Sequence, residues 1–421
     1  PDDDAFQTYL NKRGFTSISD MPVNEVSKLI GYHVLYYSYN KEKLVNFRPT
    51  GSTETEEEQN IKAGLYYKHR TRSSDAPTVE TTPTGASVMV YHLERYLPIF
   101  SYRYFQTKGI DAKNNYEAFY PNSTWTGDDG FNVSNASVKE YGIIANNGYI
   151  HAVDRVVEPL ETIYTELKNK EKYSTFLDLY DSFGVYVADD ELSKSYAKAY
   201  GVDTLYQYQH GGLPNIACEW PTSSYLNFTA LTALSYSIFA PSNTAINSFF
   251  DSFWKIGGYS SMQEVDALAL NYFLYQFIYG LVFSLPEELG DDELKNLAGS
   301  SLNINPAALN EKTMCVNGAL YGMDEIKEPS TFASVIGPLF QYKSARSFLY
   351  ALLGSSLFSS YVSDLSKYIV LVPTAEQFEA SGIRTVYSTQ GLEAEGDDGW
   401  AEISNTAKQN IVYLHSASIS S

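Results

Sequence analysis

The sequence predicts an α+β protein made of repeated domains, and two phrases that recur along the chain carry this prediction. The first phrase, at 147–159, reads NGYIHAVDRVVEP, and a related phrase, NGALYGMDEIKEP, begins 170 residues later, at 317 instead of 147. The second phrase is a short apolar strand, a proline and a polar residue before a helix, and it occurs at 236–246 and 367–378. A repeat of this length is too long for a solenoid unit, so each copy is expected to be a domain with its own core.

The residues shared by the two copies of the first phrase have backbone roles. The Asn-Gly pair turns the chain, and the proline ends the strand that follows. We expect the shared aspartates to accept hydrogen bonds from nearby backbone amides. The shared residues are Asn147, Gly148, Asp154, Glu158 and Pro159 in the first copy and Asn317, Gly318, Asp324, Glu328 and Pro329 in the second.

The second phrase sets the phase of the repeat. Pro241 ends a strand, and Asn243 is expected to cap a helix that begins near Thr244. The later copy has Pro373 but places Ala375 where Asn243 stands, and the chain opens inside an earlier copy. Three copies of this phrase and two of the other predict three domains, at 1–160, at 161–329 with an insertion at 185–231, and at 330–421. Because the chain begins inside a motif, we expect the first domain to lack its N-terminal part.

In the first domain, the acidic residues at 2–4 and the proline at 22 predict the starts of two helices. The stretch at 70–85 is rich in Ser, Thr and Pro and is expected to be a mobile surface loop. Strands are predicted at 87–91 and 98–102. A hairpin is predicted from 140–145 and 149–157.

In the second domain, 160–180 predicts a helix pair, whereas the insertion at 185–231 is expected to be irregular. Further helices are predicted at 244–254 and 265–278, with a short one at 286. The third domain has the strand of the second phrase at 368–372 but no copy of the first phrase before residue 421. Either further sequence follows, or this copy is completed differently.

Composition excludes several classes of function. The chain has 421 residues, of which 44% are hydrophobic, and a net charge of −20. Nucleic acids and anionic lipids both require a basic face, so we expect neither as a partner. No run is long and apolar enough for a membrane helix.

The sequence offers little for catalysis, and we expect no catalytic residue, no metal and no cofactor. Its six histidines form no His-x-x-x-His pair, and no Gly-x-Ser-x-Gly turn is present. His33 is expected to bond a backbone carbonyl. The acidic turns at 127–130 and 396–399 could ligate calcium, but neither has the spacing of a calcium loop. Cys218 and Cys315 could form one disulfide, although two buried thiols are favoured.

Both phrases resemble the paired signature segments of the fasciclin domain. The runs 239–246 and 147–159 match these segments, and Tyr32 and His33 supply the Tyr-His pair of that family. The second copy departs from the pattern, with Gln276 and Phe277 at that pair and Tyr321 in place of His151. The resemblance implies tandem domains, each a wedge-like β-sandwich flanked by helices. The long insertions make the chain most similar to fasciclin lipoproteins of Gram-negative gut anaerobes.

This resemblance implies a non-enzymatic protein of the cell surface that acts in adhesion or scaffolding. It also implies outer-membrane anchoring through a lipid upstream of residue 1, or a periplasmic location. The expected partner is a protein or a glycan. The alternative function is that of an accessory lipoprotein in an outer-membrane complex that imports glycans or peptides.

Aromatic residues in the insertions are the predicted partner-binding residues, because loops on a rigid scaffold usually carry binding. They stand beside Gly, Asn and Pro and could supply stacking anchors. They are Tyr206, Tyr208, His210 and Trp220 in the second domain and Tyr102, Tyr104, Tyr120 and Trp125 in the first.

Overall fold

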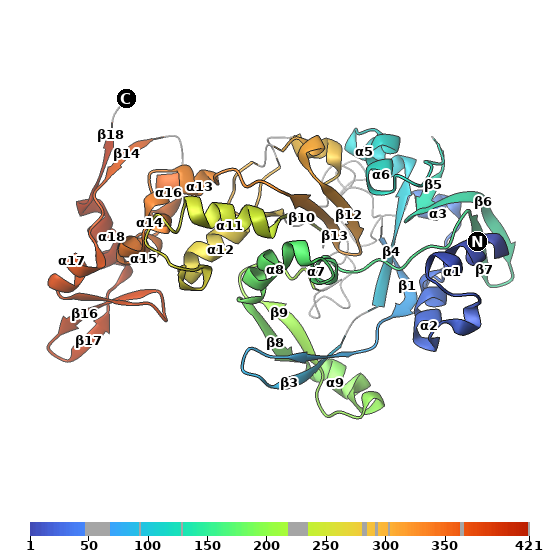
Figure 1. Ribbon diagram of the computed structural model, residues 1–421, viewed down its shortest axis with the longest axis horizontal. Helices are drawn as coiled ribbons and strands as arrows, with labels where there is room; N and C mark the ends of the chain where they lie inside the picture. Colours follow the sequence, from blue (N-terminus) through green and yellow to red (C-terminus); the bar gives the residue numbers. More distant parts are fainter. Residues whose placement is uncertain are drawn as a thin grey trace. The chain divides into compact units, whose positions relative to one another are not determined.

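The computed structural model describes residues 1–46, 68–91, 94–127, 129–217, 235–279, 284–290, 294–301, 304–362 and 366–419. These residues confirm the α+β class, with several sheets and many helices (Figure 1). The chain divides into two compact units. The first contains 1–240, 278–295 and 301–322, and the second contains 241–277, 296–300 and 323–421. The domain boundaries at 160 and 329 stay predictions.

The first unit begins with two helices of the predicted kind and a five-stranded sheet. The sheet has the order β1-β4-β5-β6-β7. Its core gathers apolar residues from β4, β5 and β6 around the buried Tyr32. The strands are β1 (Lys68–Ser74), β4 (Glu94–Ser101), β5 (Phe131–Val133), β6 (Ala136–Ala145) and β7 (Gly148–Val153). The helices are α1 (Asp3–Lys12), α2 (Val23–Tyr32), α3 (Lys41–Val45), α5 (Tyr102–Lys108) and α6 (Ala112–Phe119).

The prediction of a mobile loop at 70–85 is wrong, because most of this stretch forms strands β1 and β2 (Thr78–Thr81). Strand β1 pairs antiparallel with β4 and buries polar side chains, among them His69 and Thr71. The Thr71 hydroxyl donates to the Arg95 carbonyl at 2.7 Å. A strand whose buried side chains are polar lacks the apolar alternation by which strands are recognised in sequence.

Both copies of the first phrase form Asn-Gly hairpins, and the two hairpins belong to different sheets. Strands β6 and β7 pair antiparallel and close at Ala145 and Gly148. Strands β12 (Glu311–Cys315) and β13 (Gly318–Met323) pair in the same way and close at Cys315 and Gly318. The second hairpin belongs to a sheet of order β11-β10-β13-β12 that includes β10 (Tyr236–Pro241) and β11 (Ile278–Tyr279). Thus β7 ends its sheet among the described residues, whereas β13 is central.

The described part of the insertion, residues 185–217, contains regular elements, which corrects the expectation of an irregular segment there. It contributes β8 (Gly184–Ala188), α9 (Asp190–Tyr196) and β9 (Tyr206–His210). Strand β9 pairs antiparallel with β8 and parallel with β3 (Ser87–Val90), which gives a sheet of order β2-β3-β9-β8. The predicted helix pair before it is confirmed as α7 (Ile163–Lys168) and α8 (Ser174–Asp181). This small sheet and α7 enclose the cavity described below.

The second unit is mainly helical and has two small sheets. Strand β14 (Lys367–Val370) confirms the predicted strand of the third copy, and it pairs with β18 (Ser416–Ile419), near the end of the chain. Strands β15 (Ile383–Val386), β16 (Gly391–Gly396) and β17 (Gly399–Glu402) form a meander. The helices are α11 (Asn243–Ser252), α12 (Ala267–Tyr275), α13 (Ser330–Ala333), α14 (Gly337–Gln341), α15 (Arg346–Gly354), α16 (Phe358–Val362), α17 (Ala375–Ala380) and α18 (Asn405–Leu414).

One capping position recurs in all three copies of the second phrase, and it is the residue directly after the proline. Asp2, Ser242 and Thr374 each accept a hydrogen bond from a backbone amide three residues further on. The expectation that Asn243 caps α11 is wrong, because Asn243 is the first residue of the helix. Ala375 in the third copy therefore removes no capping bond, because Thr374 caps α17. The copies share the cap and differ at the next residue.

We expect Ser242→Ala to lower the free energy of unfolding by about 1 kcal/mol, because it removes the acceptor for the Ala245 amide. Thr244→Ala is the matched control and should change it by less than about 0.5 kcal/mol, since Thr244 is exposed and alanine suits the first helical turn. Denaturant titration of both variants measures the difference. Equal losses would contradict the capping role of Ser242.

Among the described residues, no helix is long and apolar enough to cross a membrane.

Candidate functional site

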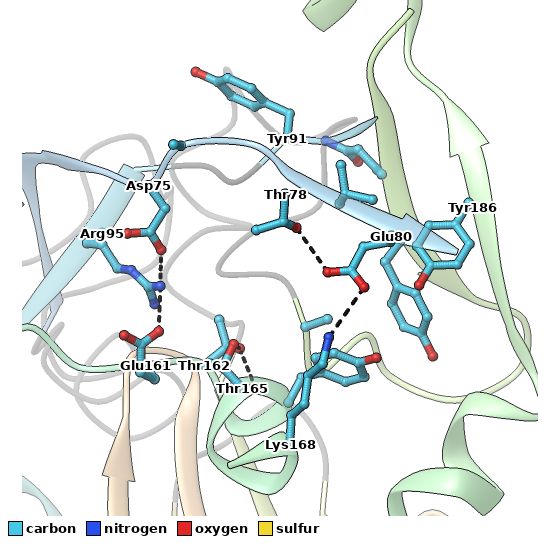
Figure 2. Close-up of a pocket in the computed structure, with 16 residues that line it drawn as sticks. Asp75, Thr78, Glu80, Tyr91, Arg95, Glu161, Thr162, Thr165, Lys168 and Tyr186 are labelled. Atoms are coloured by element: carbon cyan, nitrogen blue, oxygen red, sulfur yellow. Dashed lines mark hydrogen bonds and ion pairs between the residues drawn. The ribbon is translucent and has the colours of Figure 1, made fainter. Parts of the chain in front are cut away.

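A cavity of about 290 Å³ lies within the first unit, and Figure 2 shows its lining. Strand β2 with the segment before it lies along one side, and α7 and the segment before it lie along the other. Strands β8 and β9 contribute aromatic side chains. The volume is at the lower end of the range of about 300–1,000 Å³ typical of small-molecule sites.

One end of the cavity is an ion-pair cluster. The Arg95 guanidinium, only 5% exposed, contacts the carboxylates of both Asp75 and Glu161 (Figure 2). It also donates to the Leu160 carbonyl at 3.0 Å. Lys28 Nζ lies 2.9 Å from Asp75 Oδ1 and 3.0 Å from Glu161 Oε1. Burial raises the pKa of Asp75, but Arg95 and Lys28 outweigh burial and hold that pKa below its usual value.

A second charged pair lies further along the lining. The Glu80 carboxylate accepts from the Thr78 hydroxyl at 3.0 Å and from Lys168 Nζ at 3.3 Å (Figure 2). Together with the ion-pair cluster, this pair gives three carboxylates and three cations around the cavity. The carboxylates belong to Asp75, Glu80 and Glu161, and the cations to Lys28, Arg95 and Lys168. The charges that the described residues place around the cavity are therefore matched.

Three tyrosines form an aromatic wall. The Tyr208 ring packs against Tyr164 at 5.2 Å and against Tyr186 at 5.4 Å between centroids. The hydroxyls of Tyr208 and Tyr164 donate to the two oxygens of Asp181, at 2.7 Å and 3.2 Å. Burial raises the pKa of Asp181, and it also raises the pKa of both tyrosines, which Asp181 raises further. The wall is fixed in place because two of its rings donate hydrogen bonds to one half-buried carboxylate.

Two polar side chains of the lining have bonding capacity that the protein does not use. Gln207 is only 8% exposed, yet its side-chain amide makes no hydrogen bond within the described part of the chain. The Tyr186 hydroxyl likewise has no hydrogen-bond partner there. Both groups are therefore available to bond a ligand or water that enters the cavity.

The predicted binding residues of the insertion meet in part at this cavity. Tyr208 lines it, whereas Tyr206 and His210 lie on the same strand and are not among the lining residues. His210 Nε2 bonds the Tyr180 carbonyl at 2.8 Å, and its ring lies 4.3 Å from that of Tyr180. Trp220 lies outside the described residues. Binding by these four stays a prediction.

The four predicted binding residues of the first domain contact other residues of that domain. Tyr104 is 4% exposed and stacks edge-on against Phe105, so its ring is a core residue rather than an exposed anchor. Trp125 packs against the same Phe105 at 5.2 Å. The Tyr120 hydroxyl bonds Ser134, and burial raises its pKa. Tyr102 packs against the core around Tyr32. None of the four lines the cavity.

The two signature histidines serve the backbone, as expected for His33. Its Nδ1 lies 2.9 Å from the Leu29 carbonyl, and its Nε2 accepts from the Val157 amide at 3.1 Å. His151 Nδ1 accepts from the Gly142 amide at 3.2 Å, and its Nε2 lies 3.0 Å from the Tyr39 carbonyl. Each ring thus bonds one backbone carbonyl and one backbone amide, which fixes its orientation. Tyr321, which stands in place of His151 in the second copy, also bonds the backbone, because its hydroxyl donates to the Ser284 carbonyl at 2.7 Å.

We expect His33→Ala and His151→Ala each to lower the free energy of unfolding by about 1–3 kcal/mol, because each leaves an amide and a carbonyl unpaired. Thermal denaturation of the two variants measures the loss. His415→Ala is a suitable control, since that ring bonds only the Ile411 carbonyl of its own helix. A loss no larger than that of the control would contradict the structural role.

The remaining signature residues are structural in different ways. Asp154 accepts from the Ser137 amide at 2.8 Å, which confirms the expected bond, whereas its counterpart Asp324 is exposed. Asn317 is fully buried and bonds both the Ile163 amide and the Ile216 carbonyl, whereas its counterpart Asn147 is exposed. Tyr32 donates to the Tyr96 carbonyl. The prolines lie beside these elements: Pro159 follows β7, Pro241 ends β10, Pro329 precedes α13, and Pro373 precedes α17.

Metal and thiol chemistry have no visible basis at this site. Within the described ranges, no group of three or more His, Cys, Asp or Glu side chains could hold a metal ion. Cys315 is a buried free thiol whose pKa is raised by burial, and Cys218 lies outside the described residues. In the turn at 127–130, Asp129 pairs with Lys41, and Asp128 is not described.

Sequence reasoning missed most of the cavity. Its lining spans residues 75 to 217 and includes the expected loop at 70–85 and the expected irregular insertion. A signal was present, because YQYQH at 206–210 alternates with the period of two that indicates a strand. Such alternation predicts that Tyr206 and Tyr208 share one face of that strand.

No protein-family model and no curated protein matches the chain. Among solved structures, it is similar to the FAS1 domain pair of the insect cell adhesion molecule fasciclin I. That likeness has 11% sequence identity, covers 78% of this chain and 87% of that chain, and has a TM-score of 0.25. Because such a score reflects a loose superposition, we draw nothing about function from it.

Proposed function

We propose that this chain is a non-enzymatic binding protein of the cell surface, built of tandem fasciclin domains, that acts in adhesion or scaffolding. The observation that carries the proposal is the use of the signature residues. Polar atoms of His33, His151 and Asp154 hold backbone amides in place, and the proline-cap arrangement recurs three times. Side chains engaged in this way support a scaffold and are poorly placed for chemistry.

A capture experiment tests the proposal. The full chain is immobilised, and cross-linked membranes from the cells that express it are passed over it, with heat-denatured chain as the control. Specific retention of a surface protein or a surface glycan supports adhesion or scaffolding. Retention of an outer-membrane transporter would instead favour the accessory role in import, and retention equal to that of the denatured control would contradict a binding function.

Location and lack of catalysis are tested separately. Protease treatment of intact cells should cleave the chain if it is anchored on the outer surface, and should spare it if it is periplasmic. The purified chain should hydrolyse neither glycosides nor peptides. A turnover that His33→Ala or His151→Ala abolishes without loss of folding would overturn the non-enzymatic assignment.

A further inference from the structure

We propose that the cavity enclosed by β2, α7, β8 and β9 binds one or two neutral sugar rings, such as the end of a glycan. This inference rests on the proposed function as a surface binding protein and deepens it by naming a ligand class. Three features of the described residues carry it: matched charges, unused polar groups and a fixed aromatic wall.

The matched charges argue against charged ligands. A carboxylate or phosphate ligand requires a cation, yet Arg95 contacts Asp75, Glu161 and the Leu160 carbonyl. An ammonium ligand requires a carboxylate, yet Glu80 already holds Lys168. An anionic ligand would have to break an ion pair of Arg95, which is only 5% exposed, and would leave a buried charge without its partner. An amino acid or a peptide end is therefore disfavoured.

The unused polar groups suit hydroxyls. The Gln207 amide can both donate and accept, and so can the Tyr186 hydroxyl. Glu80 accepts only two hydrogen bonds among the described residues, so its carboxylate retains lone pairs for a hydroxyl donor. A sugar ring carries several hydroxyls that donate and accept at once, which is the pattern these groups can satisfy.

The aromatic wall supplies the apolar contact. Tyr208 and Tyr164 are held by Asp181, so their rings keep one orientation without a ligand. The rings of Tyr164, Tyr186 and Tyr208 are tilted or edge-on to one another, at 38° and 72°. They form a wall rather than a parallel slot, which suits the apolar C–H face of a sugar better than a flat base.

The test uses the full chain and a glycan array of neutral hexose and pentose oligosaccharides, followed by calorimetric titration of the best binder. Gln207→Leu removes the unused amide, and Tyr186→Phe removes only a hydroxyl. Each should weaken binding about three- to tenfold, as expected for the loss of one hydrogen bond. Melting temperatures measured alongside establish that both variants fold.

Matched controls come from the same chain. Gln209→Leu changes an exposed amide two residues along β9, and Tyr413→Phe changes an exposed tyrosine in the second unit. Both should bind like the unmodified chain. Weakening confined to the cavity variants supports the proposal.

Three outcomes would overturn it. One is that no neutral glycan is retained on the array. Another is that a glycan binds equally well to Gln207→Leu and Tyr186→Phe, which would place its site elsewhere. The third is that free amino acids, peptides or inorganic phosphate compete for the cavity when sugars do not. All three are distinct from failure of the capture experiment, which would contradict a surface-binding function whatever the cavity holds.

Discussion

Gly318→Ala should lower the free energy of unfolding by roughly 3 kcal/mol or more, and Gly148→Ala at the equivalent position should lower it by less than about 1 kcal/mol. The difference follows from where each strand lies. Gly318 has a φ of +137°, and a Cβ there would be 1.9 Å from the Tyr236 carbonyl oxygen of the neighbouring strand β10. A Cβ on Gly148 would meet only Ser38 Oγ, at 3.9 Å.

Denaturant titration of the two variants measures the contrast, and each serves as the control for the other. Circular dichroism should show loss of structure for Gly318→Ala at a denaturant concentration that leaves Gly148→Ala folded. Similar stabilities would mean that β10 can move away from β13 at little cost. That result would contradict the close approach of the two backbones.

Acidification from pH 7.5 to 5.5 should destabilise the protein, because three histidines are neutral in the folded state. Burial lowers the pKa of His33, His69 and His210, that of His69 to about 3. Since each folded pKa lies below the unfolded value of about 6.5, the unfolded chain takes up protons first. The contribution of these neutral histidines to stability is complete above the unfolded pKa. It is lost as the pH falls below that pKa, at up to about 1.4 kcal/mol per pH unit for each histidine.

The pH profile of unfolding has its own control. In a chain that carries both His33→Asn and His210→Asn, stability at pH 7.5 should be lower but should fall less steeply with acid. Protonated His33 would face the Val157 amide with a second donor, which explains why its neutral form is preferred. A flat profile for the unmodified chain between these pH values would contradict the prediction.

Local chemistry explains which parts of the fold could be predicted from sequence. The two Asn-Gly hairpins and most helices depend on turn residues, prolines and apolar spacing that are visible in a short window. Strand β1 could not be recognised, because its buried side chains are polar and only their tertiary partners stabilise them. The sequence predicts the cap of α11 one residue too far along, because Ser242 and Asn243 are both good capping residues.

The candidate site was less predictable than the fold. The sequence predicts Tyr208 as a partner-binding aromatic residue. Its place in the cavity wall depends on a hydrogen bond to Asp181, which only the packing of α8 against β9 brings near. Gln207 attracts no notice in a sequence. It becomes informative only when the structure places it at the cavity and gives its amide no partner among the described residues. Burial and missing partners are properties of tertiary structure.

The span of the cavity lining also sets an order for folding. Its walls come from residues 75 to 217, and Lys28 reaches Glu161 across 133 positions. Contacts between residues so far apart require large loops to close first, which is slow. The hairpin of β6 and β7 closes over two residues and can form early. The ligand-sized space is therefore expected to be among the last parts of the first unit to assemble.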